Sequence, residues 1–263
     1  MKVRKLFDEE NMSFWMKQIK KSDWRAGQYL YQMISEDKLA GMTGEDPQVL
    51  LLTEGDTLIA FCTYAKYDDI RDRSIGPWAG FVYTFPEHRG KRRVGKLLEY
   101  AYGLAKKDGY PALYISTDMT GFYEKYGFSF WKTMENLDGE PARVYRIEIT
   151  EMDYGDTIGK IVKGTVDRPL GTSHPDHPDM IYPVNYGYVD GITAGDGEEQ
   201  DVYVFGTDQA MAAFEGEVIG VLHRLNDCED KWIVSIGGER PSREEVLEKI
   251  SFQEQYYMGE LYM

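Results

Sequence analysis

The architecture of the first half is set by one segment, Phe81-Val-Tyr-Thr-Phe-Pro-Glu-His-Arg-Gly-Lys-Arg-Arg-Val-Gly-Lys-Leu-Leu98. It begins as an apolar strand, passes through a basic turn that contains glycine, and continues as a helix. Free backbone N–H groups and the positive end of the helix dipole favour an anion there, and the basic side chains of the turn add charge. The segment therefore predicts a pyrophosphate site. The alternative is a solvated basic turn or a nucleic-acid patch.

Strands and helices alternate on both sides of this segment. Apolar runs bounded by glycine and acidic turns predict strands at residues 49–53, 57–64, 78–85, 112–116 and 143–149. Apolar residues at helical spacing predict helices at residues 12–19, 26–34 and 94–105. Residues 1–150 are therefore predicted to form an α/β domain, a mixed sheet with flanking helices.

The pattern changes after a short polar linker at residues 151–157. Short apolar runs separated by glycine, proline and aspartate predict strands at residues 161–166, 188–192, 201–205, 218–222 and 232–236. Ser242-Arg-Glu-Glu245 is a capping box that opens a terminal helix. Residues 158–263 are therefore predicted to form a small, mostly β barrel with a C-terminal helix. His174-Pro-Asp-His-Pro-Asp179 is expected to be a loop between strands.

Composition and charge exclude several classes of protein. A length of 263 residues favours two domains. No segment has the roughly 18 consecutive apolar residues of a membrane helix. Cys62 and Cys228 give neither a disulfide pattern nor zinc-ligand spacing, so a cytoplasmic location is expected. Residues 1–150 hold 22 Lys and Arg against 22 Asp and Glu, whereas residues 151–263 hold 8 against 23 and so carry the whole net charge of -15. Neither a nucleic-acid nor a membrane partner is expected.

A second segment, Tyr114-Ile-Ser-Thr-Asp-Met-Thr-Gly-Phe-Tyr-Glu-Lys-Tyr-Gly-Phe-Ser-Phe-Trp131, has the pattern strand, short helix, strand. Together the two segments resemble the GNAT superfamily of N-acetyltransferases over roughly residues 1–150. The resemblance implies an enzyme that transfers an acetyl group from acetyl-CoA to a small amine. It implies that the turn holds the pyrophosphate of the coenzyme and that backbone N–H groups of the preceding strand polarise the thioester. The implied cofactor-binding residues are Val82, Tyr83, Thr84, Arg89, Gly90, Lys91, Arg92, Arg93, Val94, Gly95 and Lys96.

The same resemblance implies that Tyr123 protonates the departing thiolate. The alternative is a core tyrosine, and Tyr126 is the local competitor. Glu87 and Asp118 are the two candidates for a general base, and their spacing chooses neither. The turn departs from the family pattern because Arg92 and Arg93 stand where a middle glycine is common. The acceptor is not visible in the sequence: Trp15, Trp24, Tyr29 and Tyr31 either line an amine pocket or belong to the core.

Carboxylates cluster in the second half at Asp196-Gly-Glu-Glu-Gln-Asp201 and at residues 227–230. Such carboxylates can converge on a hard divalent cation such as Mg²⁺, although each turn alone is most often a solvated hairpin. With Ile181-Tyr-Pro-Val-Asn-Tyr-Gly-Tyr188, these residues resemble the soluble inorganic pyrophosphatases over about residues 158–257. The resemblance implies Mg²⁺-assisted attack of water on diphosphate. Its implied residues are Asp196, Asp201 and Asp230 on metal, Glu198 as the base, and Arg168, Tyr186 and Lys231 on phosphate.

The pyrophosphatase match is incomplete, because Glu198 replaces an aspartate and Lys231 is displaced by one position. A slower pyrophosphatase, a changed phosphate substrate, and a barrel kept only for binding or structure therefore stay open. The competing function for the whole chain is an acyl-CoA sensor whose inactive acidic barrel serves for docking or dimerisation. A homo-oligomer is compatible with either function.

Overall fold

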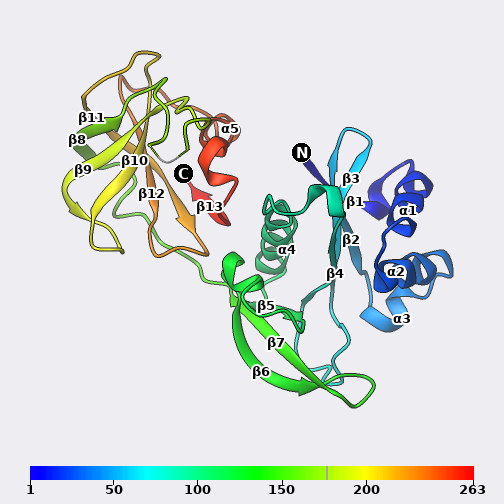
Figure 1. The fold of residues 1–263 in the computed structure, drawn as a ribbon. Coiled ribbons are helices and arrows are strands. Elements are labelled where there is room, and N and C mark those ends of the chain that lie inside the picture. The colour runs from blue at the N-terminus through cyan, green and yellow to red at the C-terminus, as the bar shows by residue number, and fades with distance from the viewer. Residues whose placement is uncertain (176) are drawn as a thin grey trace. The chain divides into compact units, whose positions relative to one another are not determined.

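The computed structural model describes residues 1–175 and 177–263, and the chain divides into two compact units, Met1–Thr150 and Glu151–Met263 (Figure 1). Residue 176, within the loop expected at residues 174–179, lies outside the described residues. None of the helices in the described ranges combines the length and the apolar character that crossing a bilayer requires.

The first unit is built on a seven-stranded sheet with the order β1-β2-β3-β4-β5-β7-β6. Its β4 and β5 pair in parallel and the other neighbours are antiparallel, which confirms the predicted mixed sheet. The strands are β1 (Lys2–Lys5), β2 (Gln48–Glu54), β3 (Thr57–Ala65), β4 (Trp78–Thr84), β5 (Ala112–Ser116), β6 (Ser129–Glu135) and β7 (Pro141–Glu148).

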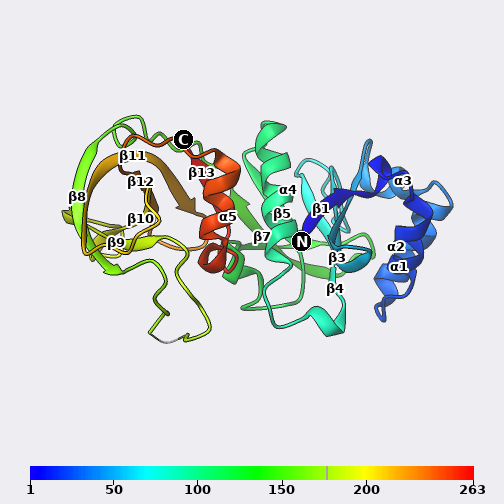
Figure 2. The same cartoon turned by 90° about the horizontal axis from the view of Figure 1, so that it is seen from above.

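Helices cover both faces of this sheet. Figures 1 and 2 show α1 (Met12–Lys20), α2 (Arg25–Ser35) and α3 (Leu39–Thr43) on one face and α4 (Gly95–Lys107) on the other. Strand β2 has a continuous buried run from residue 49 to residue 53, as expected for a strand packed on both faces. On the first face, Leu30 and Ile34 of α2 pack with Val49 and Leu51. The central strands are therefore held between two helical layers.

Strands β4 and β5 separate almost as soon as they pair. Trp78↔Tyr114 is their one matched position in the described chain. The pairing of β4 with β3 is interrupted by a bulge after Gly80, where Phe81 has a φ of +49°, and it resumes at Tyr83 and Thr84. Such a bulge bends a strand and increases its twist. The sheet therefore opens on the β5 side of β4, along residues 79–84.

The second unit is a closed five-stranded barrel with the order β12-β10-β9-β8-β11, which an additional pairing of β11 with β12 closes. The strands are β8 (Ile161–Arg168), β9 (Asn185–Thr193), β10 (Glu199–Phe205), β11 (Ala213–Arg224) and β12 (Lys231–Ser235). Helix α5 (Arg243–Glu254) starts at the predicted capping box, in which Ser242 accepts from the Glu245 N–H. The short β13 (Gly259–Tyr262), which was not predicted from the sequence, follows α5 and pairs with β11.

The segment expected to be a linker is attached to the barrel. Tyr154 packs against the apolar side chains of the barrel strands, and its hydroxyl donates a hydrogen bond to Asp230. Lys160 accepts from the backbone N–H of Val218 on β11. Residues 154–160 therefore belong structurally to the second unit.

The glycine of the Tyr-Gly-Tyr motif has a packing role. A Cβ added at Gly187 of β9 would lie 1.9 Å from the Thr165 carbonyl oxygen and 2.8 Å from the Val166 Cα of β8. Both partners are backbone atoms, so no side-chain rotation could make room. The two strands approach this closely only because position 187 carries no side chain.

We therefore expect Gly187→Ala to lower the free energy of unfolding of the barrel by at least about 2 kcal/mol, because strands β8 and β9 must move apart. Calorimetry of the full chain measures this as a lower Tm of the barrel transition. Gly103→Ala is the control: its Cβ would meet nothing within 4 Å, and alanine should stabilise α4 by a few tenths to about 1 kcal/mol. An unchanged barrel Tm in Gly187→Ala would contradict the packing argument.

Candidate functional site

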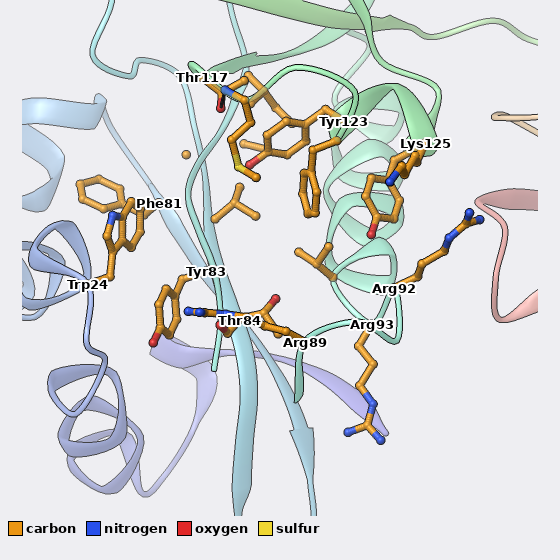
Figure 3. A pocket seen from close by; sticks show the side chains of 18 of the residues that line it. Trp24, Phe81, Tyr83, Thr84, Arg89, Arg92, Arg93, Thr117, Tyr123 and Lys125 are labelled. Atoms are coloured by element: carbon orange, nitrogen blue, oxygen red, sulfur yellow. Dashed lines mark hydrogen bonds between the residues drawn. The ribbon is translucent and has the colours of Figure 1, made fainter. Parts of the chain in front are cut away.

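The opening between β4 and β5 leads into a cavity of about 890 Å³. Figure 3 shows its lining side chains, which come from β4, from the basic turn, from the end of β5 and from the η3 segment (Tyr123–Tyr126). Most of the residues predicted to bind the coenzyme line it: Val82, Tyr83, Thr84, Arg89, Gly90, Arg92, Arg93 and Val94. Lys91, Gly95 and Lys96 belong to the same turn and helix start but are not among the lining residues.

The backbone of the basic turn forms a cradle of donors. In the described chain, the N–H groups of Gly90, Lys91, Arg93 and Val94 donate to no backbone carbonyl. Helix α4 begins directly after them, with 13 residues and without a side-chain cap at Val94. Unpaired N–H groups at a helix start, together with the helix dipole, favour an anion. The turn is therefore built to hold a negatively charged group.

Two residues of the turn have left-handed backbone. Gly90 has a φ of +79° and Arg92 a φ of +51°. Glycine adopts this conformation without strain, whereas an arginine does so at a cost. Arg92 thus stands at a position that suits glycine, as the comparison of the turn with the family pattern suggested.

Arg89 is fixed by three contacts at one edge of the cavity. Its Nε donates to the Thr84 carbonyl at 2.9 Å, and its Nη2 lies 3.7 Å from the Asp23 carboxylate. Its guanidinium also lies over the Tyr83 ring, 5.4 Å from the ring centroid. Arg93 contacts His88 Nδ1 at 3.3 Å. The positive charge beside the cradle is therefore partly positioned in advance.

Tyr123 lies at the opposite side of the cavity from this edge. Its side chain is 5% exposed, and burial raises its pKa, so the hydroxyl keeps its proton at neutral pH. Figure 3 shows the hydroxyl end directed toward the space among the lining residues. Tyr126 also lines the cavity, but its ring packs on the start of α4, where a Cβ at Gly95 would meet it at 3.0 Å.

An aromatic group lines the cavity near Arg89. Trp24 stacks on Tyr83 with ring centroids 5.8 Å apart, and it meets Phe81 edge-on at 6.5 Å. The Tyr83 hydroxyl donates to the Asp23 carboxylate at 2.5 Å. Of the four aromatic residues considered in the sequence for an amine pocket, Trp24 lines the cavity, while Trp15 is buried in the core. Asp23 was not found from the sequence, because its position depends on the fold.

The candidate bases differ in their positions. Asp118 lines the cavity, whereas Glu87 is exposed on the η2 turn (Pro86–His88) and does not. Asp68, which the sequence analysis did not consider, lies behind Gly80: a Cβ there would be 3.1 Å from the Asp68 Oδ1. Burial raises the pKa of the Asp68 carboxyl to about 6, against the hydrogen bond from the Asp69 N–H, which lowers it.

The carboxylates of the barrel do not come together as the sequence analysis expected. Asp196 and Glu198 share an exposed turn, in which the Asp196 Oδ1 accepts from the Glu198 N–H at 3.0 Å. Asp201 of β10 accepts hydrogen bonds from the Tyr186 hydroxyl and from Lys231. Asp230 instead contacts His223 Nδ1 at 2.8 Å and the Tyr154 hydroxyl.

This arrangement does not fit a magnesium site. Across residues 1–175 and 177–263, no three His, Cys, Asp or Glu side chains are grouped so that they could hold a metal ion. The convergence of Asp196, Asp201 and Asp230 that the sequence analysis expected is therefore absent from the described chain. The physical reason is that Asp201 and Asp230 are each bound to protein partners on different sides of the strands.

Of the three residues expected to bind phosphate, Lys231 and Tyr186 lie close to each other, and Arg168 is held in an ion pair. Lys231 lies 5.8 Å from the centroid of the Tyr186 ring. Arg168 stands opposite Tyr186 in the pairing of β8 with β9, and its guanidinium forms an ion pair with Asp167 at 2.6 Å. Lys231 also pairs with Glu229, whose pKa burial raises to about 7.

Each unit matches one family model. Residues 9–128 match the acetyltransferase (GNAT) family, and residues 160–258 match the inorganic pyrophosphatase family. The chain thus joins a GNAT domain to a pyrophosphatase-type domain. Among curated proteins, none matches the sequence significantly.

Solved structures of both kinds are similar to parts of the chain. An aminoglycoside 6'-N-acetyltransferase from Enterococcus faecium is 14% identical, covers 58% of this chain and 100% of its own, and has a TM-score of 0.44. A GNAT-family protein from Desulfovibrio desulfuricans is 14% identical over 57% of this chain and 99% of its own, with a TM-score of 0.42. An inorganic pyrophosphatase from Neisseria gonorrhoeae is 20% identical, covers 40% of this chain and 81% of its own, and has a TM-score of 0.30.

The raised pKa of Asp68 predicts a pH-dependent effect on stability. The unfolded carboxyl titrates near 3.9, so the folded chain binds an extra proton between that pH and about 6, and the native state loses stability as the pH rises through this window. We expect Asp68→Asn to match the parent at pH 4 and to exceed it by about 2 kcal/mol at pH 7, because the amide never ionises.

Urea unfolding of the parent and of Asp68→Asn at both pH values measures the difference. Asp72→Asn is a suitable control, because Asp72 is exposed and its pKa is lowered by hydrogen bonds from Ser74, so its removal should cost stability at pH 7. A difference between Asp68→Asn and the parent that is equal at pH 4 and pH 7 would show that the Asp68 carboxyl is not desolvated.

Proposed function

We propose that this chain, in which a GNAT domain precedes a pyrophosphatase-type barrel, is an acetyl-CoA-dependent N-acetyltransferase that acts on a small amine. The observation that carries the proposal is the coincidence of three features at one cavity. An anion cradle forms one side, the separated edge of β4 passes beside it, and a buried, protonated tyrosine lies across from both. The GNAT match over residues 9–128 supports it.

The residues of the turn fit the pyrophosphate of the coenzyme. The unpaired N–H groups of Gly90, Lys91, Arg93 and Val94 offer donors, and Arg89 adds a charge that Thr84 and Asp23 hold in place. A diphosphate can accept several such hydrogen bonds at once. Acetyl-CoA, when bound, supplies the activated acetyl group, and the cradle fixes one end of it.

The edge of β4 is suited to polarise a carbonyl. Beyond Trp78, the described β5 gives β4 no partner, so N–H groups of Val82 to Thr84 on that side are available to the cavity. Donors held in place by a strand stabilise a developing oxyanion without reorganising. In the proposed reaction these N–H groups bind the oxygen of the tetrahedral species formed when the amine attacks.

Tyr123 is proposed to protonate the thiolate as it leaves. Its hydroxyl is protonated at neutral pH, it points into the cavity, and it lies outside the aromatic group of Trp24. The amine is proposed to enter beside Trp24 and Phe81, where aromatic faces suit an apolar body or a cation. The base stays unassigned between water and the carboxylates near the cavity, of which Asp118 lines it directly.

Mg²⁺-dependent hydrolysis of diphosphate is not part of this proposal. Its expected ligands Asp196, Asp201 and Asp230 do not converge in the described chain, so the base role expected of Glu198 has no metal site to act on. A cytoplasmic location, to which two free cysteines are suited, and a homo-oligomer stay predictions.

The competing acyl-CoA sensor would share the cradle but would not release coenzyme A. Tyr123→Phe tests this difference: we expect kcat to fall by at least about tenfold, with the affinity for acetyl-CoA nearly unchanged, because only a proton donor is removed. Release of free thiol with a panel of amines measures turnover, and calorimetry measures coenzyme binding.

Tyr126→Phe is the matched control, since Tyr126 is also buried, lies in the same short helix and lines the same cavity. Its turnover should stay close to that of the parent. Loss of turnover in Tyr126→Phe but not in Tyr123→Phe would transfer the acid role to Tyr126. No thiol release by the parent with any amine, despite coenzyme binding, would favour the sensor.

A second variant tests the acceptor end. Trp24→Ala should raise the KM for the amine several-fold and leave the KM for acetyl-CoA unchanged, because its ring contacts Tyr83 and Phe81 of β4 and supplies none of the hydrogen-bond donors of the turn. Tyr29→Ala, an exposed aromatic residue on the adjoining α2, serves as the control and should change neither constant. A change confined to the KM for acetyl-CoA would place the amine elsewhere.

A further inference from the structure

We propose that the ammonium group of Lys231 is a built-in cation that takes the place of a divalent metal between the carboxylates of the barrel. In consequence the second unit binds no Mg²⁺ at Asp201 and does not hydrolyse diphosphate by a metal-dependent route. The inference concerns the second unit alone and is independent of the acetyltransferase activity proposed for the first.

The strand register brings Lys231 to Asp201. Strands β10 and β12 are parallel neighbours with Val202 opposite Trp232, so the preceding residues, Asp201 and Lys231, also stand side by side. The Lys231 Nζ donates to the Asp201 Oδ2 and to the Glu229 Oε2. One ammonium group therefore joins two carboxylates from neighbouring segments of the barrel.

Burial makes this arrangement difficult to displace. The Lys231 side chain is 3% exposed, compared with 12% for Glu229 and 27% for Asp201. A buried ammonium group is stable only when it is paired and hydrogen-bonded. A metal ion entering between the carboxylates would leave Lys231 buried without its partners. Because Lys231 is part of the chain, it is always present at the carboxylates, whereas a metal ion must bind from solution.

Tyr186 completes the group around the lysine. Its hydroxyl donates to the same Asp201 oxygen that accepts from Lys231. The aromatic ring lies beside the ammonium group, with 5.8 Å between Nζ and the ring centroid. Tyr186 and Lys231, both expected on phosphate, are thus bound to Asp201 and not directed at an outside ligand.

Asp230, a second expected metal ligand, is on the opposite side of the strands. Asp230 directly precedes β12 and contacts Tyr154, which packs against the apolar cluster that contains Trp232, whereas Lys231 lies on the other face of β12, with Ile233. Asp230 accordingly contacts His223 and Tyr154, while its carbonyl accepts from the Gln200 side chain at 2.6 Å. Mg²⁺ needs near-octahedral oxygen coordination and gives up its waters reluctantly. An ammonium group already occupies the place between the two carboxylates, and a metal ion would have to displace it.

The experiment measures Mn²⁺ binding by electron paramagnetic resonance on the full chain without coenzyme, with Mg²⁺ competition. The parent should show no saturable site at Asp201, an unchanged barrel Tm with up to millimolar Mg²⁺, and no release of phosphate from diphosphate. Lys231→Met should lower the barrel Tm and should bind Mn²⁺ at least tenfold more tightly than the parent, with the Tm recovering as Mn²⁺ is added.

Two further variants make the result specific. Lys231→Met combined with Asp201→Asn should lose the acquired Mn²⁺ site. Lys163→Met removes an exposed lysine of β8 that pairs with Glu215, and it should bind Mn²⁺ as the parent does. If Lys231→Met does not fold, Lys231→Gln replaces it as a polar variant. The Mn²⁺ binding, Tm and phosphate release of the parent test the proposal even if neither variant folds.

Saturable Mn²⁺ binding by the parent that Asp201→Asn abolishes would overturn the proposal. So would Mg²⁺-dependent release of phosphate from diphosphate that the same variant abolishes. A folded Lys231→Met or Lys231→Gln that gains no Mn²⁺ affinity over Lys163→Met would also overturn it, because the lysine would then not be holding a place that a metal can fill.

Discussion

The separation of β4 from β5 is the constraint on which the candidate active site depends. Parallel strands normally continue side by side, yet these two are matched only at Trp78↔Tyr114, and the bulge at Phe81 turns β4 away. The gap exposes strand N–H groups that a complete sheet would pair. It also lets the turn before α4 and the η3 helix face one cavity. The anion cradle and Tyr123 would otherwise be separated by a closed sheet.

In the barrel the corresponding constraint is the charge of a buried lysine. Side chains alternate along β12, so Lys231 lies on the same face as Ile233, which packs with α5, and it is buried there. An ammonium group there must be balanced, so Asp201 and Glu229 are held as its partners. Asp201, which was expected to bind a metal, thus serves together with Glu229 as an internal counter-ion. The acidic character of the half does not by itself produce a metal site.

Much of the fold and of the candidate site could be predicted from the sequence, wherever a feature depends on residues that are neighbours in the chain. The basic turn, the helix after it and the five barrel strands follow from spacing and turn residues that act on their neighbours. Asp23 and Asp68 were missed because only the packing of distant segments brings Asp23 to the cavity and Asp68 behind Gly80. The expected metal set failed for a different reason. The resemblance to the pyrophosphatases implied that Asp196, Asp201 and Asp230 converge, while in the structure Asp201 is bound to Lys231 and Asp230 is bound to His223 and Tyr154.

The motif that resembles a pyrophosphatase can persist in a barrel without metal chemistry, because the fold itself needs its residues. Tyr182 is a core residue with 2% exposure, and Gly187 permits the close approach of β8. Asn185 is fully buried: its Oδ1 accepts from the backbone N–H groups of Leu170 and Met211, and its Nδ2 donates to the Gln209 carbonyl. Each contact holds a loop or a strand in place. The motif therefore identifies the barrel architecture, while the activity depends on the charges placed around it.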